Sequence, residues 1–443
     1  MIRLRIAALI YLLFISFALN AGERIISKAE LTDRVLGFWN GQLLGNYIGF
    51  PFENLYSEEP IPILVERLYT ADYDGDIPLR INDTDRRGHV PILARSLGGA
   101  FSDDDTDIEF VTLHAVEKYG LDITYPEITE TWKTHINDYI WVANREARNL
   151  MDQGFVAPDT GRKENNIHWF QIDPQLVNEI WSAFYPGMLE QATERALWGA
   201  RITNDDWGTH PTMAYAAMIS AAFFEDDIEK LIEFAVDAVP NNGPFAEGLR
   251  DVIRWHKQQE DWRITRQLIH DKYWAYKNGE FEAPVSIVSS LNNGLTGIMA
   301  LLYGDGDYTK TVGIATSAGY DSDNQAATLG GLIGAMKGMT GLNEDVVTRM
   351  KTMDAWWEWD EPFNDTYVNI SRDEISLRTP ITEIADRIVA IAEQAIRDNG
   401  GRMTRRDGQI YYIINSDIYG ATLRRNLDGQ TLIKRKCVIW IGN

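Results

Sequence analysis

Glycine recurs at every fourth position in two segments that have the apolar spacing of helices, and this pattern restricts the fold strongly. The first segment has glycine at 37, 41, 45 and 49; the second has glycine at 330, 334 and 338, with alanine at 326, 327 and 335. Each helical glycine costs about 1 kcal/mol relative to alanine. Residues four apart share one helix face, so we expect the two bare faces to lie against each other, with their polar ends in one cleft. The spacing alone is equally consistent with a tightly packed helical core and nothing more.

The spacing of apolar residues is helical over most of the chain. From about residue 27 to 399, apolar residues recur three and four positions apart, with Gly, Pro or Asn-Gly between the runs. After residue 401, the segments 409–415 and 431–441 are rich in Ile, Tyr and Val, and Asp-Gly pairs mark turns. The sequence therefore predicts an all-α fold over residues 22–400, followed by a short, basic, β-rich tail over residues 401–443.

Residues 1–21 have the layout of a secretory signal peptide. Arg3 and Arg5 precede an apolar run over residues 6–19, and Ala21 marks a candidate cleavage site. The run is short for a membrane span, so we expect an exported protein, periplasmic or secreted, with a retained N-terminal anchor as the alternative. The net charge of −23 predicts that the chain binds neither nucleic acid nor anionic membranes, because both carry negative charge.

Two acidic clusters, far apart in the sequence, each precede a segment with helical spacing. They are Asp103-Asp104-Asp105-Thr106 and Asp321-Ser322-Asp323-Asn324. Carboxylates at a helix start commonly serve as caps, but one cap needs one carboxylate and each cluster has more. Oxygen ligands in this number suit hard divalent cations such as Mg²⁺. The scattered histidines and the single cysteine do not have zinc-binding spacing, so we expect oxygen to hold any metal.

Three segments resemble, in order and spacing, the motifs of the ADP-ribosylglycohydrolase family. They are GFWNGQLLGNYIGFPFE (37–53), SDDDTDIEF (102–110) and GYDSDNQAATLGGLIGAMKG (319–338). The resemblance implies a large orthogonal helical bundle for residues 22–400 and a centre of two Mg²⁺ ions, with Mn²⁺ as a possible substitute. It implies the metal ligands Asp103, Asp104, Asp105, Asp321, Asp323 and Asn324, and it implies Glu53 as the catalytic residue at the border of the cleft.

The resemblance also implies residues that contact the substrate, and here the chain departs from the family pattern. The residues expected to bind substrate are Asn46, Asn165, Asn166, Asn204 and Asp205. Asn46 stands where most members have aspartate, and Asn204 where related bacterial sequences have histidine. The loop GRKENN (161–166) lacks the Asn-Gly-rich segment that accompanies adenosine binding in typical members. A substrate other than ADP-ribose therefore stays open.

The resemblance predicts a Mg²⁺-dependent hydrolase that cleaves the glycosidic bond at the anomeric carbon of an ADP-ribosyl or related ribosyl substrate. That substrate would be a small molecule or an ADP-ribosylated partner. Two alternatives stay open: a metal-dependent glycosidase acting on another nucleoside-like substrate, and a non-catalytic relative that binds a ribosyl ligand. The presence of Glu53 and of both aspartate pairs favours an enzyme.

Overall fold

The computed structural model describes residues 22–67, 69, 99–102, 104–342, 365–418, 422–425 and 431–435, so the expected signal peptide and Asp103 lie outside the described residues. The α-helices are α1 (Lys28–Gly49), α4 (Thr106–Tyr119), α5 (Tyr125–His135), α6 (Val142–Asp152), α7 (Ile180–Phe184), α8 (Leu189–Ala200), α9 (His210–Ala222), α10 (Ile228–Ala238), α11 (Pro244–His256), α12 (Trp262–Tyr273), α13 (Ser290–Gly304), α14 (Tyr308–Ser317), α15 (Ser322–Leu342) and α17 (Ile381–Asp398). The 3₁₀ helices are η1 (Phe50–Phe52), η2 (Leu176–Asn178) and η3 (Asp206–Thr209). The all-α fold class expected from the sequence is confirmed.

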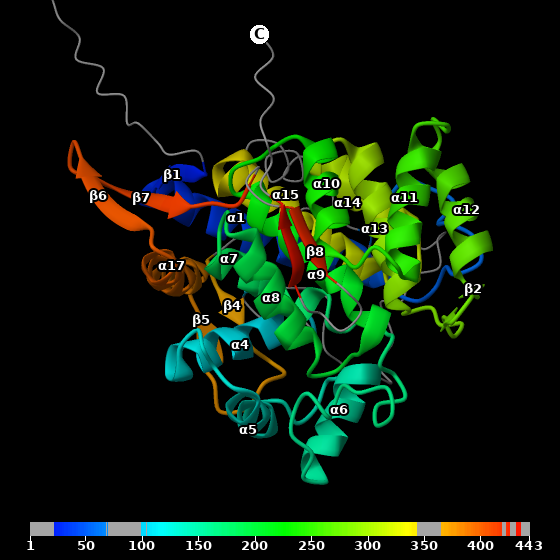
Figure 1. Ribbon diagram of the computed structural model, residues 1–443, viewed down its shortest axis with the longest axis horizontal. Helices are drawn as coiled ribbons and strands as arrows, with labels where there is room; N and C mark the ends of the chain where they lie inside the picture. The colour runs from blue at the N-terminus through cyan, green and yellow to red at the C-terminus, as the bar shows by residue number, and fades with distance from the viewer. Residues whose placement is uncertain are drawn as a thin grey trace, which may run out of the picture.

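The strands are few and short. They are β1 (Glu23–Ser27), β2 (Lys277–Asn278), β3 (Phe281–Glu282), β4 (Tyr367–Val368), β5 (Arg378–Thr379), β6 (Arg402–Arg406), β7 (Gln409–Asn415), β8 (Thr422–Arg425) and β9 (Thr431–Arg435). Strand β7 lies between β1 and β6 in an antiparallel sheet beside α17, and it therefore joins the first strand of the chain to the segment that follows α17 (Figure 1). The strand expected over 409–415 is confirmed as β7, and the strand expected over 431–441 is described only for its first half, β9.

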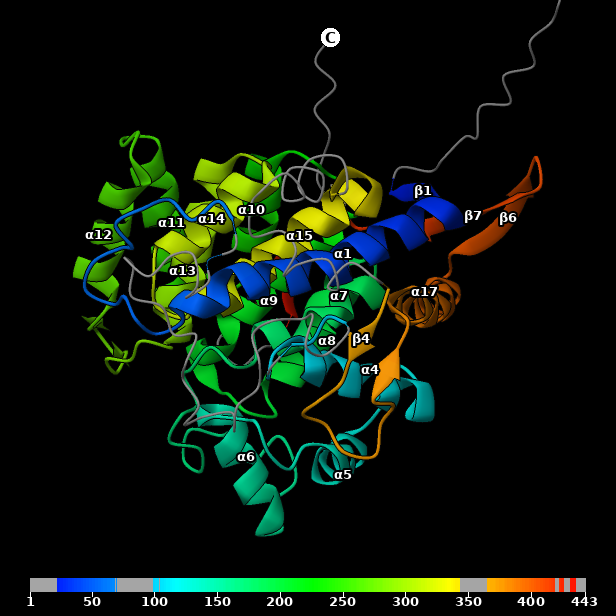
Figure 2. The same cartoon turned by 180° about the vertical axis from the view of Figure 1, so that it is seen from behind.

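Helices α1 and α15 lie side by side near the middle of the molecule (Figure 2). A Cβ atom added at Gly41 would lie 2.1 Å from the carbonyl oxygen of Gly330, and one added at Gly330 would lie 2.2 Å from the carbonyl oxygen of Gly41. Gly37 and Gly334 have the same reciprocal relation, at 2.3 and 1.9 Å. Real Cβ atoms do not come this close to oxygen, so only glycine permits the two backbones to touch. The close approach expected from the sequence is confirmed.

Polar contacts fix how far α1 is shifted along α15. The Arg34 guanidinium donates to the carbonyl oxygen of Met336, near the C-terminal end of α15, at 2.8 Å. The Ser322 hydroxyl, at the first residue of α15, donates to the carbonyl oxygen of Gly49, the last residue of α1, at 3.2 Å. The two helices are therefore antiparallel, and the end of α1 meets the start of α15. Within the described ranges, no helix is long and apolar enough to cross a membrane.

Candidate functional site

A cavity of about 490 Å³ lies beside the meeting point of α1 and α15, within the size range of small-molecule sites. Its walls are formed by Glu53, Asn54, Asp104, Asp105, Trp141, Val142, Asn144, Gln171, Ile172, Asp173, Ser286, Ile287, Val288, Asp321, Asp323 and Asn324. The structure thus brings together Glu53 and five of the six residues expected to bind metal, from three separate parts of the chain. The sixth, Asp103, lies outside the described residues.

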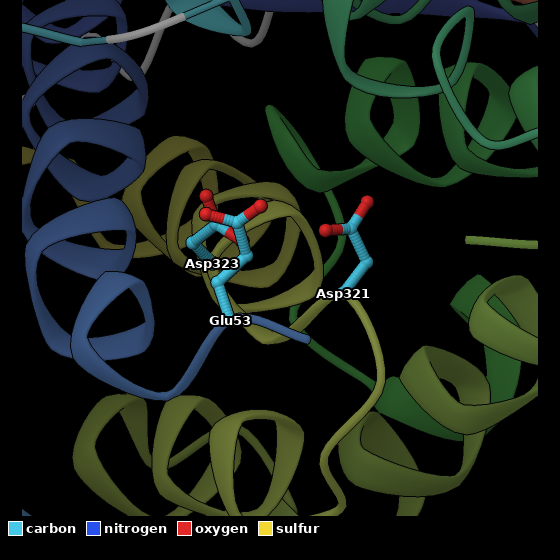
Figure 3. A group of neighbouring side chains, drawn as sticks. All are labelled: Glu53, Asp321 and Asp323. Atoms are coloured by element: carbon cyan, nitrogen blue, oxygen red, sulfur yellow. The ribbon is translucent and has the colours of Figure 1, made fainter. Parts of the chain in front are cut away.

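Three carboxylates meet in one group in this cavity. Glu53, Asp321 and Asp323 each offer an oxygen atom, and these atoms all lie within 4.8 Å of one another. Figure 3 shows the three side chains beside the start of α15. Glu53 and Asp323 are buried and Asp321 is half-buried, so water screens their mutual repulsion only in part. An all-oxygen donor set of this kind fits a hard divalent cation such as Mg²⁺ or Mn²⁺.

Backbone hydrogen bonds hold the loop after Glu53 against the loop before Asp321. The backbone N–H of Asn54 donates to the carbonyl oxygen of Tyr320 at 2.9 Å, and the backbone N–H of Tyr320 donates to the carbonyl oxygen of Tyr56 at 2.8 Å. Asn54 and Tyr320 both have a positive φ, 60° and 65°, which is uncommon for residues other than glycine. Such backbone strain persists only where surrounding contacts impose it. Here those contacts place Glu53 beside Asp321.

Arg266 of α12 connects the same two loops from behind. Its side chain is fully buried and donates to the carbonyl oxygens of Ser57 and Glu58 at 2.5 and 2.8 Å, and to that of Ala318 at 3.1 Å. Its guanidinium also lies 4.4 Å from the centre of the Tyr320 ring. A single cation thereby satisfies three backbone acceptors from segments far apart in sequence. No local pattern around Arg266 indicates this role.

The start of α4 supplies Asp104 and Asp105. Asp105 occupies the N-cap position, but its side chain makes no capping hydrogen bond. It accepts a hydrogen bond from the Asn46 amide of α1 at 3.3 Å, and Ser102 accepts the backbone N–H of Thr106. The capping explanation considered for this cluster therefore does not account for Asp105. Asn46, one of the five residues expected to contact substrate, instead contacts a candidate metal ligand.

The other four residues expected to bind substrate do not line the cavity. They are Asn165, Asn166, Asn204 and Asp205. The side-chain amides of all three asparagines donate to backbone carbonyl oxygens. Asp205, which directly precedes η3, accepts the backbone N–H groups of Lys163 and Asp206. Their hydrogen bonds fix the conformation of loops within residues 143–208. We therefore leave these four residues out of the proposed site.

Several polar residues on the cavity wall were not expected from the sequence. Gln171 and Asp173 lie on a segment that pairs with residues 288–290, through hydrogen bonds from Ile172 to Val288 and from Ser290 to Phe170. Asp173 also accepts the backbone N–H of Asn144 at 3.0 Å. Burial raises the pKa of Asp173 to about 7. No acidic run or glycine pattern marks these positions, so only the packing of distant loops could identify them.

Two further carboxyl groups are buried under this site. Glu109 lies one turn after Asp105 on α4, and Glu179 lies between η2 and α7. Gln42 of α1 donates to both, at 3.1 and 3.2 Å. Burial raises the pKa of Glu179 to about 8, and burial together with repulsion from Glu179 raises the pKa of Glu109 well above its ordinary value. Proton binding to this pair is therefore coupled to folding.

Replacing Glu179 by glutamine should make the chain more stable at pH 8 than the parent. The folded state binds the Glu179 proton more tightly than the unfolded state, whose pKa is near 4.5. Folding stability contributed by this group is present below pH 4.5 and is lost as the pH rises towards 8. An amide is neutral at every pH, so the variant should gain roughly 3 kcal/mol over the parent between pH 5 and 8.

Urea unfolding at pH 5, 6, 7 and 8, in buffer with a chelator, measures this difference. Glu164→Gln, at an exposed position, is the matched control and should show no comparable gain with pH. A difference between Glu179→Gln and the parent that is the same at pH 5 and pH 8 would contradict the coupling.

Comparison with known proteins identifies the family of this chain. The family model for ADP-ribosylglycohydrolase matches residues 27–394, a range that contains Glu53 and both acidic clusters. One solved structure, described as an ADP-ribosylglycohydrolase-related protein complex, has a TM-score of 0.48 and 16% sequence identity, and the match covers 83% of this chain and 99% of that chain. A comparison with curated proteins gave no match.

Proposed function

Because this chain belongs to the ADP-ribosylglycohydrolase family, we propose that it is a Mg²⁺-dependent hydrolase acting at the anomeric carbon of an ADP-ribosyl or related ribosyl substrate. Membership of the family supports a glycohydrolase-type activity. The observation that carries the proposal is the meeting of Glu53, Asp321 and Asp323 within 4.8 Å, in a cavity that also contains Asp104 and Asp105. Surface carboxylates commonly pair with basic residues, whereas this group of acids converges in a partly buried space.

Asp104, Asp105, Asp321 and Asp323 are the residues proposed to hold two divalent ions, with the Asn324 amide oxygen as a further neutral ligand. The Asn324 side chain is 3% exposed, and its Oδ1 atom has no hydrogen-bond partner among the described residues. When bound, the ions would supply positive charge that orients ribose hydroxyls and makes water more acidic. The negative charge of the four aspartates offsets that positive charge, which would otherwise oppose an oxocarbenium-like transition state.

Glu53 is the proposed general base. Its Oε1 atom accepts a hydrogen bond from the Asn54 side chain at 2.9 Å, which holds the carboxylate in one orientation. Water adds to the anomeric carbon while the bond to the leaving group breaks, and the electron pair of that bond stays with the leaving group. Glu53 takes a proton from the attacking water and passes a proton to the leaving group, so the reaction is a net hydrolysis.

Replacing Asp321 or Asp104 by alanine should remove half or more of the stabilisation of the chain by Mg²⁺. With Mg²⁺ at one hundred times its Kd, the parent should gain about 2.7 kcal/mol. Loss of a charged ligand should weaken binding at least about tenfold, since even partners outside the direct ligand set cost that much. Thermal unfolding and calorimetric titration with Mg²⁺ and Mn²⁺ measure both quantities. Asp152→Ala, at an exposed side chain, is the control. Parent-like Mg²⁺ affinity in Asp321→Ala would contradict the assignment.

Turnover distinguishes the proposed function from its two alternatives. ADP-ribosylated arginine, ADP-ribosylated serine and simple nucleosides are assayed with Mg²⁺ and with a chelator. Metal-dependent hydrolysis of an ADP-ribosyl compound supports the proposal. Hydrolysis that needs metal but spares ADP-ribosyl compounds supports a glycosidase for another ribosyl substrate. Metal binding without any hydrolysis supports a non-catalytic relative.

A further inference from the structure

We propose that Asp173, Asn144 and Gln171 form a second subsite in the same cavity, which binds a leaving group rich in hydroxyls, such as a sugar. The inference rests on the proposed function, because Glu53 and the aspartates are then occupied by the ribosyl side of the cleaved bond. The remaining cavity wall must meet the other part of the substrate.

Three buried acceptor atoms carry this inference. Asp173, Asn144 and Gln171 are 7%, 1% and 6% exposed, and all three line the cavity. The Oδ2 atom of Asp173, the Oδ1 atom of Asn144 and the Oε1 atom of Gln171 have no hydrogen-bond partner within the described part of the chain. Buried acceptors are normally satisfied, because leaving them without a donor costs free energy. A bound group that brings several donors would satisfy all three.

Hydrogen bonds hold Asp173 and Gln171 in place. Oδ1 of Asp173 accepts the backbone N–H of Asn144 at 3.0 Å, and Nε2 of Gln171 lies 3.1 Å from Nδ1 of His168. The backbone carbonyl of Gln171 accepts from the Asn204 amide at 2.6 Å. The acceptors of Asp173 and Gln171 are therefore fixed before any ligand binds, which reduces the entropy cost of recognition.

Hydroxyl groups match this wall better than phosphate or guanidinium groups. The charged side chain of this subsite is the carboxylate of Asp173, and no described residue of the cavity wall is basic, so a phosphate on the leaving group would find no cationic side chain here. The wall also offers a donor, the hydroxyl of Ser286. A guanidinium only donates hydrogen bonds. A hydroxyl both donates and accepts, so it can bond to the buried acceptor atoms and to a donor on the wall. Trp141, half-buried on the same wall, adds a flat apolar surface.

Ligand-observed NMR with simple probes tests the subsite without requiring turnover. The probes are D-glucose, myo-inositol, methyl β-D-ribofuranoside and L-arginine, each added to the full chain in the presence of Mg²⁺. The hydroxyl-rich probes should bind the parent and Glu53→Gln. Binding of glucose or inositol should weaken roughly tenfold or more in Asp173→Asn and in Asn144→Ala. The first variant loses the charge of the carboxylate, and the second loses a buried hydrogen bond to the probe. Asn149→Ala, at an exposed asparagine of α6 that does not line the cavity, is the matched control and should bind like the parent.

Two results would overturn the subsite: the hydroxyl-rich probes fail to bind the parent, or they bind Asp173→Asn and Asn144→Ala as tightly as the parent. Binding of L-arginine alone, lost in the same two variants, would overturn the sugar assignment. Failure of the proposed function is seen separately, as the absence of metal-dependent hydrolysis of any ribosyl compound. Probe binding that depends on Asp173 supports the subsite even in that case.

Discussion

Replacing Gly41 by alanine is expected to destabilise the chain by at least about 3 kcal/mol, and replacing it by leucine is expected to prevent folding. The added Cβ atom would lie 2.1 Å from the carbonyl oxygen of Gly330. Neither backbone can move alone, because the two helices touch again at Gly37 and Gly45. Relief would require α1 and α15 to separate along their length, and the residues buried on both helices would then lose their packing.

Urea unfolding followed by circular dichroism measures this effect, with Gly154→Ala as the control. Gly154 is exposed, has a φ of +94° and has no atom within 4 Å of an added Cβ. That variant should therefore cost only the strain of a left-handed backbone, about 1 kcal/mol. A Gly41→Ala chain that unfolds at the same urea concentration as Gly154→Ala would show that the helices can move apart cheaply.

Replacing Glu53 by glutamine is expected to reduce kcat by about 10³-fold while the chain still binds Mg²⁺. Glutamine keeps the size of the side chain and an oxygen that can accept from Asn54, but it cannot take a proton from water. The change therefore removes the proposed base without opening the cavity. Asp321 and Asp323 stay in place to hold the metal, so stabilisation by Mg²⁺ should survive in this variant.

Single-turnover assays of the substrate found active for the parent measure the loss. Asn149→Ala, at an exposed position off the cavity wall, is the control and should keep parent activity. A Glu53→Gln chain with parent kcat would show that another group accepts the proton. Loss of Mg²⁺ stabilisation in this variant would instead make Glu53 a metal ligand, as its distance from Asp321 and Asp323 permits.

The family motifs and the two glycine patterns were enough to predict the helical fold and the cavity residues Glu53, Asp104, Asp105, Asp321, Asp323 and Asn324. These features are local in the sequence. A glycine every fourth residue has a physical cost, which makes the pattern visible without a structure, whereas Glu53 and the assignment of the metal ligands were implied by the resemblance. The structure places those six residues on one cavity wall.

The amide residues illustrate what such patterns could not predict. Asn166 and Asn144 are both buried asparagines. Asn166 donates to three backbone carbonyl groups, whereas Asn144 lies on the cavity wall. Nothing in the neighbouring sequence distinguishes them, because the difference depends on which distant loops lie next to each side chain. Position within a resembling motif favoured Asn166, and the packing of the loops favours Asn144.

The sequence by itself determined that two helices with glycine along one face would touch. It also determined that an acidic residue would follow the first of these helices and that acidic residues would lie at the start of the second. This was possible because helix periodicity fixes which residues share a face within one segment. Only the tertiary structure decided which side chains meet across segments, such as Asp173 with Asn144, or Arg266 with the loops next to Glu53 and Asp321. Such contacts depend on long-range packing. Residues far apart in sequence become neighbours, and no local sequence pattern predicts that they will meet.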